Sequence, residues 1–192
     1  MVTRLSSAES GVSSAASSVS LDGAFRVRLL SVARGELGVS ERTGRNDGER
    51  VGEYLAYCGL DEGYEWCAAF VSWCFGQVGR DEPRTPWSPS LFPAARAVWP
   101  NGGGRLAGGG RAGGVQAGDV FGIWVREKGR IGHAGLVESW DGRWCVTVEG
   151  NSGDAVRRVR RPVSTIYRVA DWVADLVVDG VAAPGSGEGG EP

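Results

Sequence analysis

The stretch from Glu65 to Cys74 constrains the fold most, because it predicts a helix that is apolar on nearly every side. Such a helix lies in the middle of a domain, with other elements packed around it. Cys67 would occupy the first turn, where free backbone amides and the helix dipole favour a thiolate over a thiol. The sequence therefore predicts a central helix with a nucleophilic cysteine at its open end.

Two amphipathic helices are predicted ahead of the central one. The first runs from an N-cap at Asp22 to Gly38. The second follows a capping box formed by Asn46 and Glu49 and ends at Gly59. Each carries an apolar stripe on one face, so we expect both to pack within the domain.

The length and composition indicate one domain between two tails. The chain has 192 residues, of which 42% are hydrophobic, enough for a single sizeable core. Residues 1–21 are Ser-rich and residues 179–192 are Gly-rich, and both are predicted to be disordered. The domain is therefore expected at residues 22–178.

Charge, hydropathy and cysteine spacing exclude several classes of function. A net charge of -2 gives no basic surface for nucleic acid. No apolar run is long enough to cross a membrane, and the first twenty residues lack the apolar core of a secretory signal. Cys58 and Cys74 are interpreted as buried core thiols, and no cysteine pair has zinc-ligand spacing. We expect neither a metal nor another cofactor.

Regular structure is interrupted after the central helix. Four prolines between residues 83 and 93 break it, although residues 91–99 are predicted to hold a short helix. Residues 101–114 contain eight glycines in fourteen positions, which predicts a mobile surface loop. The alternative, a phosphate-binding loop, lacks the Gly-Lys-Ser or Gly-Lys-Thr that should follow it.

From Asp119 the apolar pattern has a period of two, which predicts consecutive antiparallel strands. The expected strands are Val120–Val125, Ile131–Trp140, Trp144–Glu149 and Thr165–Val169. A basic cluster precedes the last of them, at Arg157, Arg158, Arg160 and Arg161. We interpret this cluster as a charged edge strand that resists pairing with other chains. Contact with an anionic polymer is the alternative.

The hairpin at residues 141–142 decides what surrounds His133, the only histidine of the chain. A two-residue turn would put His133 and Glu149 on opposite faces of the sheet. A three-residue turn would gather His133, Glu149 and Asn151 on one face. The longer turn is preferred, because it also pairs two aromatic rings, those of Trp140 and Trp144.

Cys67, His133 and a polar group that orients the imidazole are the components of nucleophilic acyl transfer. His133 would take the proton of Cys67 and later donate it to the leaving amine. Glu149 or Asn151 would hold the ring in the required tautomer. The structural alternatives are an ordinary strand-end carboxylate for Glu149 and a turn former beside Gly150 for Asn151.

These residues resemble the CHAP domain (cysteine, histidine-dependent amidohydrolase/peptidase) of the NlpC/P60 group. The resemblance covers about residues 25–170. The matching stretches are residues 46–48, 66–74, 118–120, 132–135 and 148–151. The most specific feature is the order of Cys, His and Glu/Asn, with the Cys opening a helix.

The resemblance implies a papain-like α+β fold, in which N-terminal helices pack on a small antiparallel sheet. It implies that Cys67 is the nucleophile and His133 the base, and that Glu149 and Asn151 support His133. Trp66 is expected to bind substrate, and so is Trp140.

The sequence departs from the family pattern at two places. Glu65 stands where the family often has Pro, and its carboxylate is expected to raise the pKa of Cys67. Some relatives bind calcium through acidic residues ahead of the Cys. Here Asn46, Asp47 and Glu49 are too few for that site and are explained as capping residues.

The resemblance implies a monomeric peptidoglycan hydrolase. It would be either an N-acetylmuramoyl-L-alanine amidase or a peptide endopeptidase. The alternatives are a thiol peptidase or acyltransferase on another substrate, and an inactive wall-binding module. Without a signal segment, we expect synthesis in the cytoplasm and non-Sec delivery to the wall, by phage lysis, a phage tail or a secretion machine.

Overall fold

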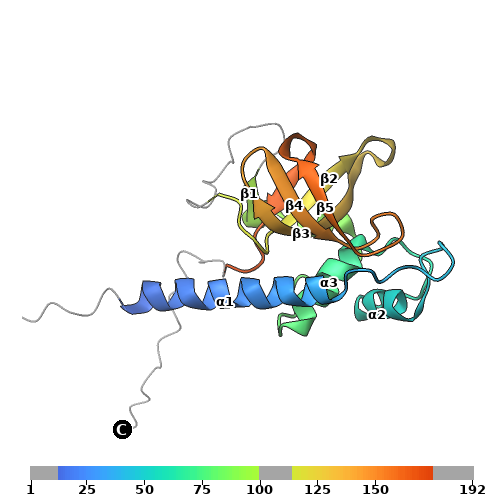
Figure 1. Ribbon diagram of the computed structural model, residues 1–192, viewed down its shortest axis with the longest axis horizontal. Helices are drawn as coiled ribbons and strands as arrows, with labels where there is room; N and C mark the ends of the chain where they lie inside the picture. Colours follow the sequence, from blue (N-terminus) through green and yellow to red (C-terminus); the bar gives the residue numbers. More distant parts are fainter. Residues whose placement is uncertain (1–12, 100–113, 175–192) are drawn as a thin grey trace, which may run out of the picture.

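The computed structural model describes residues 13–99 and 114–174, and these residues form two layers. Helices α1 (Ser13–Gly35), α2 (Glu49–Tyr57) and α3 (Cys67–Gln77) lie along one side of a sheet (Figure 1). The strands are β1 (Ala97–Trp99), β2 (Val120–Val125), β3 (Arg130–Trp140), β4 (Trp144–Glu149), β5 (Arg157–Pro162) and β6 (Arg168–Ala170). Within the described residues their order is β1-β6-β2-β3-β4-β5, with antiparallel neighbours. The expected α+β class is confirmed.

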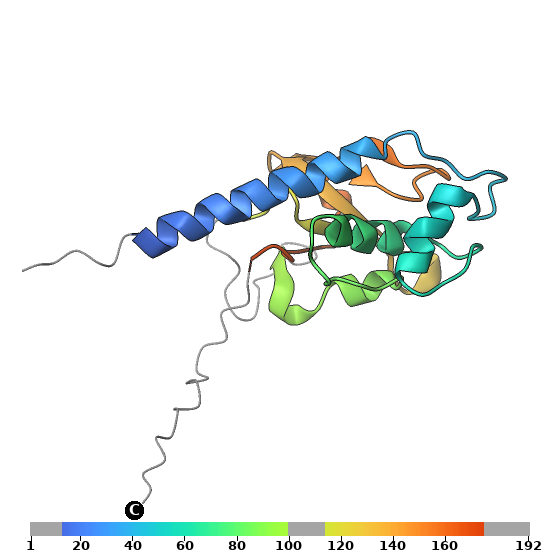
Figure 2. The ribbon, with the colours of Figure 1, turned by 90° about the horizontal axis from the view of Figure 1, so that it is seen from below.

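The apolar stretch predicted to be central is α3. Every residue from Cys67 to Phe75 is buried, as expected for a helix that is apolar all round. The helix contacts α1, α2 and β3, and α1 and α3 lie side by side when viewed from the helix side (Figure 2). The prediction of a central helix with Cys67 in its first turn is confirmed.

α1 begins at Ser13 rather than at the expected N-cap Asp22, so residues 13–21, predicted to be a disordered tail, are helical here. No Gly or Pro interrupts this segment, and its alanines have high helix propensity. Leu29 and Ala33 are fully buried, whereas Leu21 is 71% exposed. From Phe25 onward, one face of α1 therefore packs on the domain. The other tail predictions, at residues 1–12 and 179–192, lie outside the described residues.

α1 is fastened to the sheet by a buried cation. The guanidinium of Arg26 lies 2.7 Å from a carboxylate oxygen of Asp119, which precedes β2, and 2.7 Å from one of Asp171, which follows β6. Both partners are hydrogen-bonded, so the buried charges are compensated. This pairing holds the helical layer against the middle of the sheet.

The capping box predicted for α2 is wrong. The helix begins at Glu49, and its N-cap is Gly48, which makes no side-chain cap. Asn46 instead has a φ of 57°, and its side-chain oxygen accepts a hydrogen bond from Asn151. A long-range partner therefore takes the oxygen that the local pattern assigned to the helix end.

The segment between α3 and β2 contains no long helix in its described part. Residues 91–99, predicted to be helical, include the end of a 3-10 turn at Ser88–Leu91, a second turn at Ala94–Arg96 and strand β1. Pro89 and Pro93 explain why a longer helix does not form. Of the predicted mobile loop at 101–114, all but Gly114 lies outside the described residues.

The hairpin between β3 and β4 departs from the expected register next to its turn and follows it farther along, where Leu136 pairs with Val148. Trp140 pairs with Cys145, so the predicted pairing of Trp140 with Trp144 is wrong. Asp141 accepts hydrogen bonds from the backbone N–H groups of Arg143 and Trp144, which lengthens the loop. An irregularity between Val137 and Ser139 then restores the register of the longer turn.

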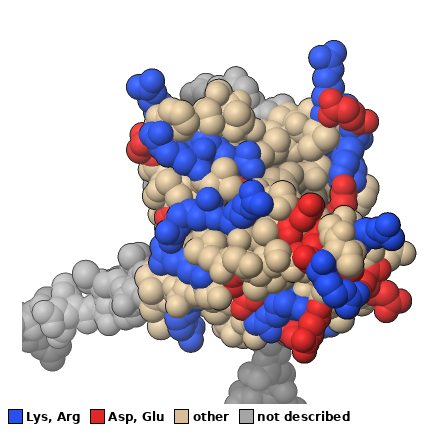
Figure 3. Space-filling view, turned by 45° about the vertical axis from the view of Figure 1, so that its right-hand side comes forward, with Lys and Arg blue, Asp and Glu red and all other residues tan. Residues whose placement is uncertain are grey.

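β5 is the terminal strand of the described sheet, which confirms the prediction of a charged edge. Its residues Arg157, Arg158 and Arg160 are exposed. Charge is unevenly spread over the surface: in Figure 3 basic side chains gather over the left-hand part, and most acidic ones lie on the right. In the described residues, no helix is long and apolar enough to cross a bilayer.

Candidate active site

Cys67 is the first residue of α3, and its side chain is buried against the sheet. Its Sγ lies 3.4 Å from the hydroxyl of Ser88 and is hydrogen-bonded to His133 and to the backbone of Ala134. Helix and strand thus meet at the sulfur atom. The thiol has donors on several sides, an environment that stabilises a thiolate.

His133 lies on β3, in the part of the strand beyond its last pair with β4, Leu136–Val148. Its Nε2 is 2.8 Å from Oε2 of Glu149. Because an imidazole has two nitrogens, Nδ1 is the one that meets Cys67. The ring of Phe121 packs edge-on at 6.2 Å and limits its movement.

Glu149, the last residue of β4, is a fully buried carboxylate. Arg161 of β5 binds it with two hydrogen bonds of 2.6 Å, one to each oxygen, and Thr147 donates a third from its hydroxyl. A bidentate pair with a guanidinium is among the strongest hydrogen-bonded arrangements of a carboxylate. The carboxylate that holds His133 is therefore itself held by two neighbouring strands.

This network separates charge between the thiol and the imidazole. Burial disfavours ionisation of Cys67, but its hydrogen bond with His133 and the imidazolium charge lower its pKa. Burial also disfavours the imidazolium, yet Cys67 and Glu149 together raise the pKa of His133 to about 9. Burial opposes the charge on Glu149, but Arg161, His133 and Thr147 together outweigh it and lower its pKa to about 2. The network therefore favours a thiolate beside an imidazolium.

The residues of this site lie within a stretch that matches a known domain family. A family comparison matches residues 59–151 to the CHAP domain, a range that includes Cys67, His133 and Glu149. The chain contains a CHAP domain. The CHAP domain here shows the papain-like arrangement expected, with the cysteine at the start of a helix and the histidine on an antiparallel sheet.

Two solved structures are similar to this chain at low identity. The peptidoglycan hydrolase RipB from Mycobacterium tuberculosis is 16% identical, with a TM-score of 0.49, over 79% of this chain and 66% of that one. A mutated form of the resuscitation promoting factor interacting protein RipA is 12% identical, with a TM-score of 0.46, over 80% of this chain and 64% of that one. The chain thus spans slightly less than two thirds of each. A search of curated proteins found no match.

Of the two residues predicted to orient His133 in the CHAP domain, Glu149 contacts the imidazole. Asn151 has a φ of 54° and donates its side-chain N–H to Asn46 at 2.9 Å. The chain turns away from β3 directly after Glu149, and the amide of Asn151 turns with it. Asn151 therefore joins the loop ahead of α2 to the end of β4.

The two tryptophans predicted to bind substrate lie elsewhere. Trp66 is fully buried, stacks on Tyr54 at 5.6 Å and donates its indole N–H to Glu41. The structure therefore contradicts a substrate-binding role for Trp66, which is a core residue. Trp140 packs against Trp99 at the hairpin end of β3, seven residues from His133 or about 20 Å of strand. At that distance Trp140 does not reach a substrate bond held at His133.

Two residues of the site were missed in the sequence. The sequence pattern assigns Arg161 to a charged edge strand and gives no role to Ser88. A signal for Arg161 exists: it shares one face of β5 with the apolar Val159, and these two residues are half-buried where Arg158 and Arg160 on the other face are exposed. Ser88 reaches Cys67 from a turn 21 residues later, and no local pattern reveals such a contact.

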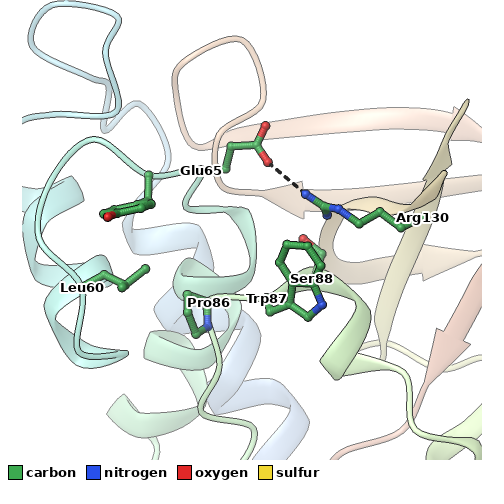
Figure 4. Close-up of a pocket in the computed structure, with 7 residues that line it drawn as sticks. Leu60, Glu65, Pro86, Trp87, Ser88 and Arg130 are labelled. Carbon is green, nitrogen blue, oxygen red and sulfur yellow. Dashed lines mark ion pairs between the residues drawn. The ribbon is translucent and has the colours of Figure 1, made fainter. Parts of the chain in front are cut away.

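A cavity of about 220 Å³ opens beside the active site (Figure 4). Its walls include Tyr64, Pro86 and Trp87, and Glu65 and Arg130 point toward each other across one side. Glu65 also pairs with Lys128. The expectation that Glu65 raises the pKa of Cys67 is wrong, because that pKa is lowered and the carboxylate faces two cations.

The acidic residues ahead of α2 accept hydrogen bonds from their own loop and from Trp66. Asp47 accepts hydrogen bonds from the backbone N–H and the hydroxyl of Thr43, which lower its pKa. Glu41 accepts one from the backbone of Asn46. Across residues 13–99 and 114–174, no group of three or more His, Cys, Asp or Glu side chains is placed to hold a metal ion.

Proposed function

We propose that this CHAP domain is a cysteine hydrolase that cleaves an amide bond in peptidoglycan. The observation that carries the proposal is the continuous hydrogen-bonded line from Cys67 through His133 to Glu149, with the sulfur at a helix N-terminus. The family match supports amide hydrolysis by the cysteine and histidine. The alternative of an inactive binding module does not explain why all three groups are aligned and their charges separated.

In the first half of the proposed reaction, the thiolate of Cys67 attacks the carbonyl carbon of the amide. The backbone N–H of Cys67 stabilises the oxyanion that forms. His133 then gives its Nδ1 proton to the leaving nitrogen, the carbon–nitrogen bond breaks, and a thioester remains on Cys67.

In the second half, water hydrolyses the thioester. His133 takes a proton from the water molecule as its oxygen attacks the carbonyl carbon. The carbon–sulfur bond breaks, the carboxylic acid leaves, and the thiolate–imidazolium pair is restored. Throughout, Glu149 holds the Nε2 proton of His133, and Arg161 keeps Glu149 ionised.

Two amide bonds of peptidoglycan are candidates for cleavage. An amidase would cut between the sugar and the stem peptide and release an intact peptide. An endopeptidase would cut within the stem or cross-bridge and create a new terminus inside the peptide. The masses of the released fragments distinguish the two products.

The test is to incubate purified protein with sacculi and to analyse the soluble products by mass spectrometry. We expect the wild-type protein to release fragments and the Cys67→Ala variant to release none. Cys58→Ala is the matched control, because this half-buried thiol lies outside the site and its loss should leave release unchanged. Absence of release by the wild type from sacculi of several chemotypes would refute the proposal.

A further inference from the structure

The cavity next to Cys67 is placed to receive a group adjacent to the bond that reacts. Ser88 lines the cavity, and its hydroxyl is 3.4 Å from the Sγ of Cys67. Any group held there lies within one or two residues of the reacting carbonyl. Trp87 and Tyr64, which are 50% and 56% exposed, provide apolar surface at its mouth.

Arg130 is held in a fixed orientation within this cavity. Its guanidinium lies 3.9 Å from the centroid of the Trp87 ring, and its Nη1 donates to the backbone of Ile131 at 3.1 Å. Stacking on an aromatic face leaves the N–H edge of a guanidinium available for a planar acceptor. Figure 4 shows this edge turned toward Glu65 across the cavity.

The carboxylate now opposite Arg130 binds it only loosely. The distance from Nη2 of Arg130 to Oε2 of Glu65 is 3.8 Å, longer than a hydrogen bond. Glu65 makes its close ion pair with Lys128 instead. Two cations and one carboxylate leave the group with a net positive charge, which favours an anionic ligand over an ammonium group.

We propose that this cavity binds a residue of the substrate that carries a free carboxylate, which pairs with Arg130 while its apolar part lies on Trp87. The inference rests on the proposed function, since it assumes a stem peptide as substrate. When the carboxylate binds Arg130, Glu65 keeps Lys128 as its partner. Stem peptides whose carboxylate has been converted to an amide would leave the guanidinium without its anion and would be poor substrates.

The test uses two soluble disaccharide-peptide fragments that differ only in that group, a free carboxylate or a carboxamide on the acidic residue of the stem. The wild-type protein should cleave the free acid with a kcat/KM at least about tenfold higher. Arg130→Gln should abolish that preference, mainly by slowing cleavage of the acid. Arg126→Gln, which changes an exposed arginine four residues away, is the matched control and should keep it.

Binding to the inactive Cys67→Ala variant, measured by calorimetry, separates this inference from the proposed function. Tighter binding of the acid than of the amide, lost in a Cys67→Ala, Arg130→Gln double variant, supports the carboxylate subsite whether or not cleavage occurs. If the protein releases fragments from sacculi but cleaves the acid and the amide with equal kcat/KM, the proposed hydrolase function stands and the carboxylate subsite is refuted. Failure to bind either fragment would also overturn it.

Discussion

Cys67 and Cys74 lie on the same helix and both thiols are buried, yet their pKa values shift in opposite directions. Burial drives the pKa of Cys74, in the body of α3, well above its ordinary value. The same burial acts on Cys67, but His133 and neighbouring donors reverse the direction. The difference shows that the buried position makes a thiol inert unless an adjacent cation and the start of the helix support the charge.

The largest expected effect comes from removing the cation. His133→Ala should lower kcat/KM by about a thousandfold, because both the charge partner and the proton donor are lost. The pKa of Cys67 should rise toward the behaviour of Cys74. The rate of iodoacetamide labelling as a function of pH measures this directly. Fast labelling of Cys67 at pH 7 in this variant would mean that the helix alone sustains the thiolate.

Glu149→Gln should lower kcat/KM by about a hundredfold, because an amide keeps the shape of the carboxylate but not its charge. Without that charge the imidazolium is less stable, so the pKa of His133 should fall from about 9 and the alkaline limb of the pH–rate profile should move down. Glu138→Gln is the matched control, since Glu138 pairs with Arg34 and Arg158 outside the site. Equal effects of the two substitutions would contradict the assigned role.

Arg161→Gln should lower kcat/KM by about tenfold through its effect on Glu149. A residue that only stabilised the fold would change the melting temperature without moving the alkaline limb. We expect the limb to move to higher pH, opposite to its movement in Glu149→Gln, because Glu149 stays ionised at this pH and the loss of a nearby cation stabilises the imidazolium. Arg158→Gln, an exposed neighbour on the same strand, should leave the limb in place.

Activity and stability should both fall as the pH rises through about 9, where His133 loses its proton. The folded-state pKa of His133 lies above its ordinary value of 6.5, so its stabilising contribution is complete below 6.5 and disappears toward 9. Calorimetry should show a decrease in melting temperature of roughly 5 °C over this range. The pKa of Glu149 is lowered from 4.5 to about 2, so its contribution is lost only between these values in acid. If the melting temperature of the wild type fell no more over this pH range than that of His133→Ala, the assignment to His133 would be contradicted.

The smallest effect on activity is expected at the other thiol. Cys74→Ala should leave kcat/KM unchanged and should lower the free energy of unfolding by about 1 kcal/mol, because it opens a small cavity in the core. Urea denaturation measures the second quantity. A loss of kcat/KM comparable to that of His133→Ala would contradict the view that Cys74 is only a core residue.

Local patterns were sufficient to predict the elements that carry the chemistry. The all-round apolar character of residues 66–75 placed Cys67 at the start of a buried helix, and alternation of period two placed His133 and Glu149 on neighbouring strands. These properties depend on residues close together in the chain. The capping box at Asn46 shows the limit of such reasoning, since a residue 105 positions away takes its side chain.

The sequence by itself determined the fold class and the placement of Cys67 and His133, the proposed nucleophile and base, on a helix start and a strand. Only the tertiary structure decided that Glu149 rather than Asn151 contacts His133, that Arg161 holds Glu149, and that Trp66 belongs to the core. The physical reason is that periodicity assigns a side chain to a face of its own element. Which group it meets there depends on bulges, loop lengths and the packing of distant elements, and these are settled only when the whole core forms.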